Sequence, residues 1–177
     1  MTNENELSAA RADFIEKMGI LAQMDGMPRI AGRLFAMLVF DGRRYSFSEL
    51  AEALQVSRAS VSTNVRLLEE REVIRRVARP GDRQDYFELG EAPYERLLRG
   101  AALRAGRTRA SIEETLDALP AEETALLQRL QDYAGLYAAI ETSVTAALDS
   151  LVAPQTGRRK PAAPSMADER AAEKEAL

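Results

Sequence analysis

The chain has 177 residues, of which 46% are hydrophobic and 29% charged, enough for one domain with an ordinary core or one domain plus a tail. It contains no cysteine and no histidine, which excludes disulfides, thiolate metal sites and Ser-His-Asp or Cys-His nucleophiles. We therefore expect no metal ligand, no cofactor and no catalytic residue. The polar first residues lack a signal-peptide pattern and no apolar run could cross a membrane, so we expect a cytoplasmic protein without a membrane partner.

The distribution of charge is uneven, although the formal net charge is −4. Residues 58–83 contain seven arginines and four carboxylates, whereas residues 111–149 contain eight carboxylates and one arginine. A basic region on an acidic protein is the pattern that a DNA-binding face requires. An arginine-rich composition would explain the use of arginine over lysine, but it would not explain the clustering.

Two helices are expected in the N-terminal region. Residues 7–24 form an amphipathic pattern that ends at Gly26, and its apolar residues Leu7, Phe14, Met18 and Leu21 share one face. Pro28 suits the first turn of a second helix, which runs to about Phe40 and is apolar on most sides. The second helix is therefore predicted to be central in the core.

A helix-turn-helix is predicted next. Ser46 and Glu49 have capping-box spacing, and the short helix that follows carries Leu50, Ala51 and Leu54 inward. After a turn at residues 55–56, Ser57 is a natural N-cap for a helix that runs from residue 58 to about residue 71.

A β-hairpin is expected after this second helix. Residues 73–77 and 86–89 have strand character, and the Pro-Gly pair between them indicates a turn. A hairpin in this place is typical of a DNA-binding wing.

The helix that begins after Ser57 has two different faces. Val61, Val65 and Leu68 lie at helical spacing on the core side. The opposite side combines small residues, hydroxyls and arginines, which suit contacts to base edges and phosphates. In addition, an arginine near the tip of the wing can enter the minor groove. The alternative to DNA contact is that this side of the helix simply faces solvent. The predicted DNA contacts are Ser57, Arg58, Ala59, Ser60, Ser62, Thr63 and Arg66 on the helix, and Arg75, Arg76, Arg79 and Arg83 on the hairpin.

Two long helices are expected in the C-terminal part, from Pro93 to about residue 119 and, after the break at Pro120, from residue 121 to about 152. The last helix carries an apolar heptad pattern that predicts a dimerisation seam. From Pro154 onward no core pattern is present, and a disordered tail is expected. The seam residues are Leu126, Leu130, Tyr133, Tyr137, Ile140, Val144 and Leu151.

A family resemblance rests on four stretches: MPRIAGRL at residues 27–34, FSELAEAL at 47–54, VSRASVSTNVRLLEE at 56–70 and PGDRQDYF at 80–87. With these residues the chain resembles the MarR superfamily of winged helix-turn-helix regulators, and within it the GbsR-like branch. The resemblance implies a homodimer that binds a pseudo-palindromic operator on double-stranded DNA, usually as a repressor, and in some members responds to a small-molecule effector.

The expected fold is mainly α with a small β-hairpin wing, in which a winged helix-turn-helix is flanked by long terminal dimerisation helices. We assign residues 1–26 to the N-terminal dimerisation helix, 27–91 to the winged domain, 92–153 to the C-terminal dimerisation helices and 154–177 to the tail. One departure from the family pattern is Glu72, where glycine is usual after the recognition helix; its cost there is about 1 kcal/mol.

Several alternatives remain open from the sequence. The winged domain could serve protein assembly without an operator of its own, although a docking face would then be expected to show exposed apolar anchors. An enzyme is a further alternative, but without histidine and cysteine the chain has few side chains suited to catalysis. Tyr133 and Tyr137 could form a ligand cage instead of seam packing. Phe14, Met18, Phe35 and Met37 could line an effector pocket or simply pack in the core.

Overall fold

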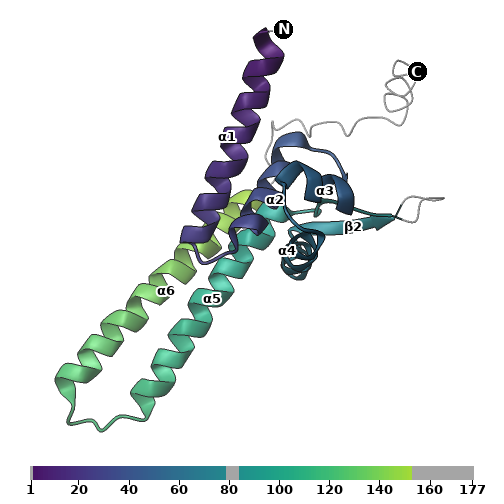
Figure 1. Cartoon of the computed structure of the whole chain (residues 1–177). Coiled ribbons are helices and arrows are strands. Elements are labelled where there is room, and N and C mark those ends of the chain that lie inside the picture. The colour runs from purple at the N-terminus through teal and green to yellow at the C-terminus, as the bar shows by residue number, and fades with distance from the viewer. Residues whose placement is uncertain (1, 79–83, 153–177) are drawn as a thin grey trace.

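The computed structural model describes residues 2–78 and 84–152, which form a mainly α-helical fold with one small sheet (Figure 1). The predicted wing-tip contacts Arg79 and Arg83 and the tail after residue 152 lie outside the described residues. The fold class expected from the sequence is confirmed, with one additional strand. The elements are α1 (Thr2–Met24), α2 (Arg29–Asp41), β1 (Tyr45–Ser46), α3 (Phe47–Leu54), α4 (Arg58–Glu70), β2 (Ile74–Ala78), β3 (Asp85–Leu89), α5 (Pro93–Asp117) and α6 (Thr124–Val152).

The sheet is antiparallel with the strand order β1-β3-β2. β2 and β3 form the predicted hairpin, in which Arg76 lies opposite Phe87. β1 was not predicted, because two residues carry no alternation; it exists through pairing with β3, where Tyr45 lies opposite Phe87. The capping box at the start of α3 is confirmed: the Ser46 amide donates to the Glu49 carboxylate at 2.6 Å, and the Glu49 amide donates to Ser46 Oγ at 3.3 Å.

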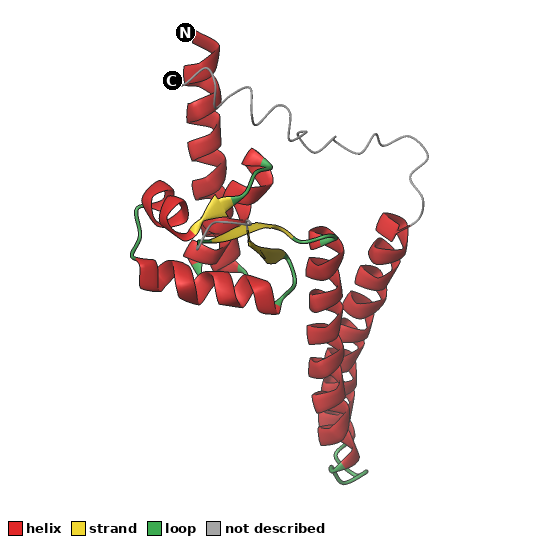
Figure 2. Ribbon diagram, turned by 90° about the vertical axis from the view of Figure 1, so that its right-hand side faces the viewer, coloured by secondary structure: helices red, strands yellow, loops and turns green. Residues whose placement is uncertain are grey.

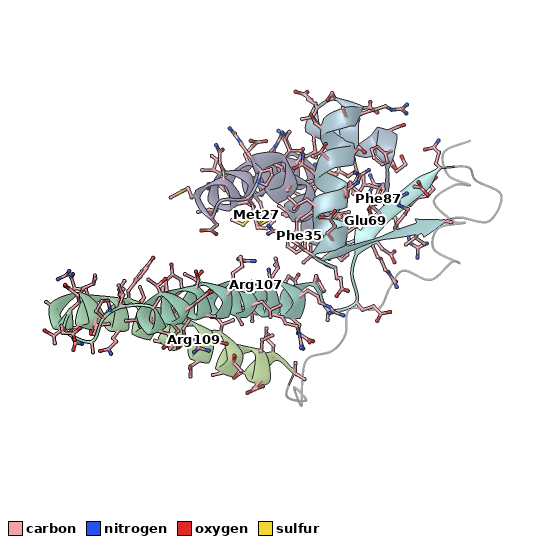
Figure 3. The ribbon with its side chains drawn as sticks, turned by 90° about the horizontal axis from the view of Figure 1, so that it is seen from below. Met27, Phe35, Glu69, Phe87, Arg107 and Arg109 are labelled. Carbon is pink, nitrogen blue, oxygen red and sulfur yellow. The ribbon has the colours of Figure 1, made fainter. Side chains whose placement is uncertain are left out.

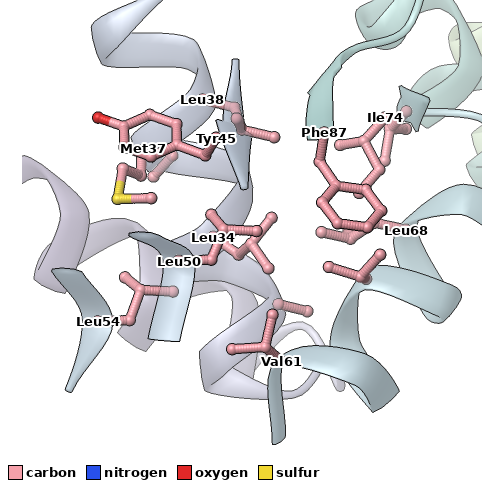
Figure 4. Close-up of a cluster of buried hydrophobic side chains, with 14 of the residues drawn as sticks. Leu34, Met37, Leu38, Tyr45, Leu50, Leu54, Val61, Leu68, Ile74 and Phe87 are labelled. Atoms are coloured by element: carbon pink, nitrogen blue, oxygen red, sulfur yellow. The ribbon is translucent and has the colours of Figure 1, made fainter. Parts of the chain in front are cut away.

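The core lies between α2, α3, α4 and the sheet (Figure 4). α2 is central as predicted, and Leu34, Met37 and Leu38 have no exposed surface. From α1 the core receives Ile15, which the sequence pattern did not single out, whereas Leu7 and Leu21 of the predicted apolar face are 60% and 49% exposed. These two leucines stay exposed because α1 packs chiefly against α2.

α1 and α2 cross at very short range because glycine lies at the contact. A Cβ atom on Gly32 would lie 2.4 Å from Ala22 Cβ and 2.9 Å from the Met18 carbonyl oxygen. Gly19 approaches Arg33 of α2 in the same way, since its Cβ would lie 2.5 Å from Arg33 Cγ. These close approaches determine how α1 is oriented on the winged domain.

α5 and α6 form an antiparallel helical hairpin that projects from the winged body, and each packs chiefly against the other (Figures 1 and 2). No helix among residues 2–78 and 84–152 has the length and apolar character needed to span a membrane. The buried residue of α6 is Ala134, about 100° around the helix from Tyr133. The predicted seam is therefore divided within one chain: Leu126, Leu130, Tyr137 and Val144 are half-buried, and Tyr133, Ile140 and Leu151 are exposed.

Candidate nucleic-acid interface

The start of α4 is built as a helix N-terminus with an accepting cap. Ser57 Oγ accepts a hydrogen bond from the Ser60 amide at 3.1 Å and lies 3.0 Å from Ser60 Oγ, which confirms Ser57 as the N-cap. Gln55 takes a left-handed conformation, with φ of 53°, and so closes the turn between α3 and α4. The free amides of the first turn and the helix dipole give this end of α4 a positive potential.

The two faces of α4 are separated as the sequence predicts. Val61, Val65 and Leu68 are at most 1% exposed. Asn64 is also buried, a position that the sequence analysis missed; its Nδ2 donates to the Ser60 carbonyl at 2.7 Å, a bond that polar spacing alone does not reveal. The opposite side is exposed and carries Arg58, Ala59, Ser62, Thr63 and Arg66.

The exposed side chains differ in how free they are to bind a ligand. Arg66 forms no ion pair with any residue in the described part of the chain. Thr63 Oγ1 donates to the Ala59 carbonyl at 3.1 Å, so its hydroxyl proton is engaged within the helix. Arg58 Nη2 donates to Ser48 Oγ at 2.6 Å, which ties the first residue of α4 to α3. Ser60 is half-buried and belongs to the cap rather than to the outer face.

A hollow lies between the N-terminal half of α4 and the base of the wing. Serine, arginine and amide groups line much of its wall, together with one aromatic edge and one carboxylate. The sequence pattern does not identify Phe47, Ser48, Gln84 and Asp85 as part of this surface, because they become neighbours of α4 only through the fold. The lining residues are Phe47, Ser48, Arg58, Ala59, Ser62, Gln84 and Asp85.

Arg75 and Arg76, the two predicted DNA contacts on β2, both form ion pairs within the protein and lie on opposite faces of the sheet. Arg75 lies 2.7 Å from the carboxylate of Glu88, which also receives Arg44 at 2.6 Å. Arg76 lies 3.3 Å from the carboxylate of Glu69 on α4. Hydrogen bonding to that carboxylate raises the pKa of Arg76 above its ordinary value.

A partly buried cluster joins α1 to the winged domain. The Arg11 guanidinium donates two hydrogen bonds of 2.6 Å to the Asp41 carboxylate, and the Tyr45 hydroxyl also donates to Asp41. Burial alone would raise the pKa of Asp41, but the hydrogen bonds from Arg11 and Tyr45 outweigh it and hold that pKa below its ordinary value. The Arg43 guanidinium lies 3.7 Å from the centre of the Tyr45 ring.

The residues predicted as an effector pocket pack on the core. Met37 has no exposed surface, and Phe14, Met18 and Phe35 are partly buried against the core cluster. This arrangement supports the core-packing alternative.

A different cleft lies where the end of α4 faces α5. Arg71, Arg104 and Arg107 line it and form no ion pair with other residues in the described ranges. Figure 3 shows Arg107 on the side of α5 toward Met27 and Phe35. Its apolar lining is Met27, Leu97 and Leu103.

Comparison with known proteins identifies the family and the individual proteins to which this chain is similar. A family model, the MarR family, matches residues 25–85. The HTH-type transcriptional regulator MmpR5 of Mycobacterium tuberculosis (strain ATCC 25618 / H37Rv) is 44% identical over 78 residues, which are 44% of this chain and 47% of that protein. The chain thus matches that curated relative over about half of the relative's length. A crystal structure of a transcriptional regulator is 31% identical with a TM-score of 0.68, and the match covers 80% of this chain and 97% of the other.

Proposed function

We propose that this chain, which belongs to the MarR family of transcriptional regulators, binds specific sites on double-stranded DNA as a homodimer and so represses transcription. The observation that carries the proposal is the outer face of α4, a capped helix beside a wing, where Arg66 is exposed and unpaired among the described residues. Arginine can make a bidentate contact to guanine, and the positive end of the helix favours phosphate.

DNA selection followed by salt titration tests this proposal. Fragments bound from a genomic or randomised pool would supply the operator. Affinity for it should fall with salt, with a logarithmic slope of about −0.9 per neutralised phosphate. Arg66→Ala should cost about 1 to 3 kcal/mol of binding free energy and reduce the slope. Arg99→Ala on α5, outside α4 and the wing, removes the same charge as a control.

A slope near zero would contradict DNA binding altogether. If Arg66→Ala and Arg83→Ala both leave the affinity unchanged, the alternative of a protein-assembly module gains support instead.

The homodimer is proposed from the apolar side chains that the single chain leaves uncovered. On α1, Leu7 and Met24 are 60% and 77% exposed, and on α6, Leu136 and Ile140 are 53% and 39% exposed. Among the described residues the α5–α6 hairpin packs chiefly on itself, so its exposed apolar side chains would gain burial from a partner. A second copy would place the two recognition helices about 34 Å apart, one turn of DNA.

A substitution on the exposed side of α6 tests the dimer. The sequence pattern favours Leu130 and Ile140 as targets; the structure favours Ile140, because Leu130 is half-buried within its own hairpin. Ile140→Asp should give monomers or unfolded chain by light scattering, whereas Thr142→Asp, about 160° around the helix, should leave the dimer intact. A dimer that is unperturbed by Ile140→Asp would refute the role of this surface.

Regulation by a small molecule is a second proposal, and the cleft between α4 and α5 supports it. Five arginines and three carboxylates line the cleft, and three of these arginines form no ion pair among the described residues. Together with the apolar side chains in the lining, they suit an amphiphile with an anionic head. Decanoate should then raise the unfolding temperature of the protein, and Arg104→Ala combined with Arg107→Ala should abolish the shift. If decanoate leaves the unfolding temperature of the parent protein unchanged, a fatty carboxylate is excluded as the ligand.

A further inference from the structure

Arg76 lies on the core-facing side of the wing, not on its outer side. In the hairpin, Arg76 lies opposite Phe87 and Ala78 lies opposite Asp85, so these four side chains share one face of the ribbon. Phe87 on that face has no exposed surface, and the Arg76 guanidinium lies 5.5 Å from the centre of its ring. Arg75, one residue earlier, belongs to the other face.

One guanidinium on this face links three elements of the winged domain. Arg76 Nε and Nη2 each lie 3.3 Å from an oxygen of Glu69 on α4, and Nη1 lies 3.1 Å from an Asp85 oxygen on β3. Figure 3 shows Glu69 beside Phe87, where α4 meets the strands. The planar guanidinium fork holds both carboxylates in a defined geometry, which a lysine ammonium would not do.

Glu69 lies on the side of α4 that turns toward the wing. It follows Ser62 by seven residues, so the two lie on nearly the same side of the helix, and Ser62 shares the hollow with Asp85. Unpaired carboxylates at this place would repel the phosphates of bound DNA. Their pairing with Arg76 removes that repulsion, and it also joins the end of the recognition helix to the base of the wing.

We infer that Arg76 is a positioning residue that holds the β2–β3 ribbon at a fixed angle to α4, and not the direct DNA contact that the sequence predicts. The inference rests on the DNA binding proposed above for its functional consequence, but its structural content can be measured without DNA. Arg76 thereby sets the width of the hollow between the recognition helix and the wing.

The first experiment measures the ribbon itself, in the absence of DNA. The chain has no cysteine, so Glu70→Cys on α4 and Ala78→Cys on β2 accept spin labels at two defined sites. With labelled chains diluted into an excess of unlabelled chains, so that only the distance within one protomer is measured, the parent should give one narrow distance distribution, and Glu69→Gln or Arg76→Lys should broaden or shift it. Distributions that are unchanged in both variants would overturn the inference, whatever the protein does with DNA.

The second experiment uses the sign of the effect on DNA affinity. If Arg76 positions the wing, Glu69→Gln should weaken operator binding about fivefold, which corresponds to about 1 kcal/mol. If Arg76 instead contacts phosphate directly, Glu69→Gln frees it and removes a negative charge, so binding should tighten. Glu70→Gln removes the same charge outside the bridge and should leave affinity equal or slightly higher.

Arg76→Lys separates charge from geometry. A positioning role predicts weaker binding with an unchanged salt slope, because the positive charge stays and the fork is lost. Arg66→Ala, a direct contact in our proposal, should reduce the slope in the same assay. Parent-like affinity of Arg76→Lys, or tighter binding of Glu69→Gln, would overturn the inference.

Discussion

Replacing Gly32 with alanine tests whether the α1–α2 crossing is as tight as the structure indicates. In an open helix position the change would stabilise the protein by up to about 1 kcal/mol, because alanine is the better helix former. At Gly32 the new Cβ would lie 2.4 Å from Ala22 Cβ and 2.9 Å from the Met18 carbonyl oxygen, and that oxygen belongs to backbone that cannot rotate away. Overpacking of this kind costs about 1 to 3 kcal/mol.

We therefore expect Gly32→Ala to lower the free energy of unfolding by about 1 to 2 kcal/mol. Urea unfolding at a fixed protein concentration measures it, since the stability of the proposed dimer would depend on concentration. Gly135→Ala on α6 is the matched control: nothing lies within 4 Å of its Cβ position, so this variant should be stabilised.

A partial rescue makes the test specific to the crossing. Ala22→Gly removes the nearest atom, so in a double-mutant cycle it should recover part of the loss caused by Gly32→Ala. If the two variants Gly32→Ala and Gly135→Ala have the same free energy of unfolding, the reasoning is refuted, because α1 and α2 would then move apart without an energetic cost.

Three further substitutions test local features of the winged domain. Ser57→Ala should cost about 1 kcal/mol in urea unfolding, because the Ser60 amide loses its acceptor, whereas Ser57→Asp should not; equal loss in both would contradict the cap. Asp41→Asn should remove a contribution to stability that is present above the ordinary aspartate pKa and is lost as pH falls through the lowered pKa of the folded state. The free energies of unfolding of parent and variant should therefore converge in acid. A difference that stays constant from neutral pH into acid would contradict this. Glu72→Gly should stabilise by about 1 kcal/mol, since Glu72 has a φ of 56°; a loss of stability would show that its contact with Arg96, at 2.5 Å, outweighs the strain.

Local patterns in the sequence determined the elements of this protein. Ser46, Glu49 and Ser57 predicted two helix starts because capping depends on residues three apart along the chain. The apolar spacing of Val61, Val65 and Leu68 predicted the buried side of α4, and hence the exposed side that would face DNA. Glu72 was expected in a strained turn, and its positive φ confirms that expectation.

Tertiary structure decided which side chains are paired or covered within the chain and which are left exposed for a partner. The sequence assigned Arg76 to DNA by its charge and its place on a strand, but Glu69 and Asp85 approach it only once α4, β2 and β3 have assembled. The heptad pattern of α6 indicated one apolar seam, and the fold divided it between packing against α5 and an exposed stripe at Tyr133, Ile140 and Leu151. Periodicity records that a face is apolar, but what covers that face depends on residues far apart in the chain, and for that reason the sequence alone could not assign it.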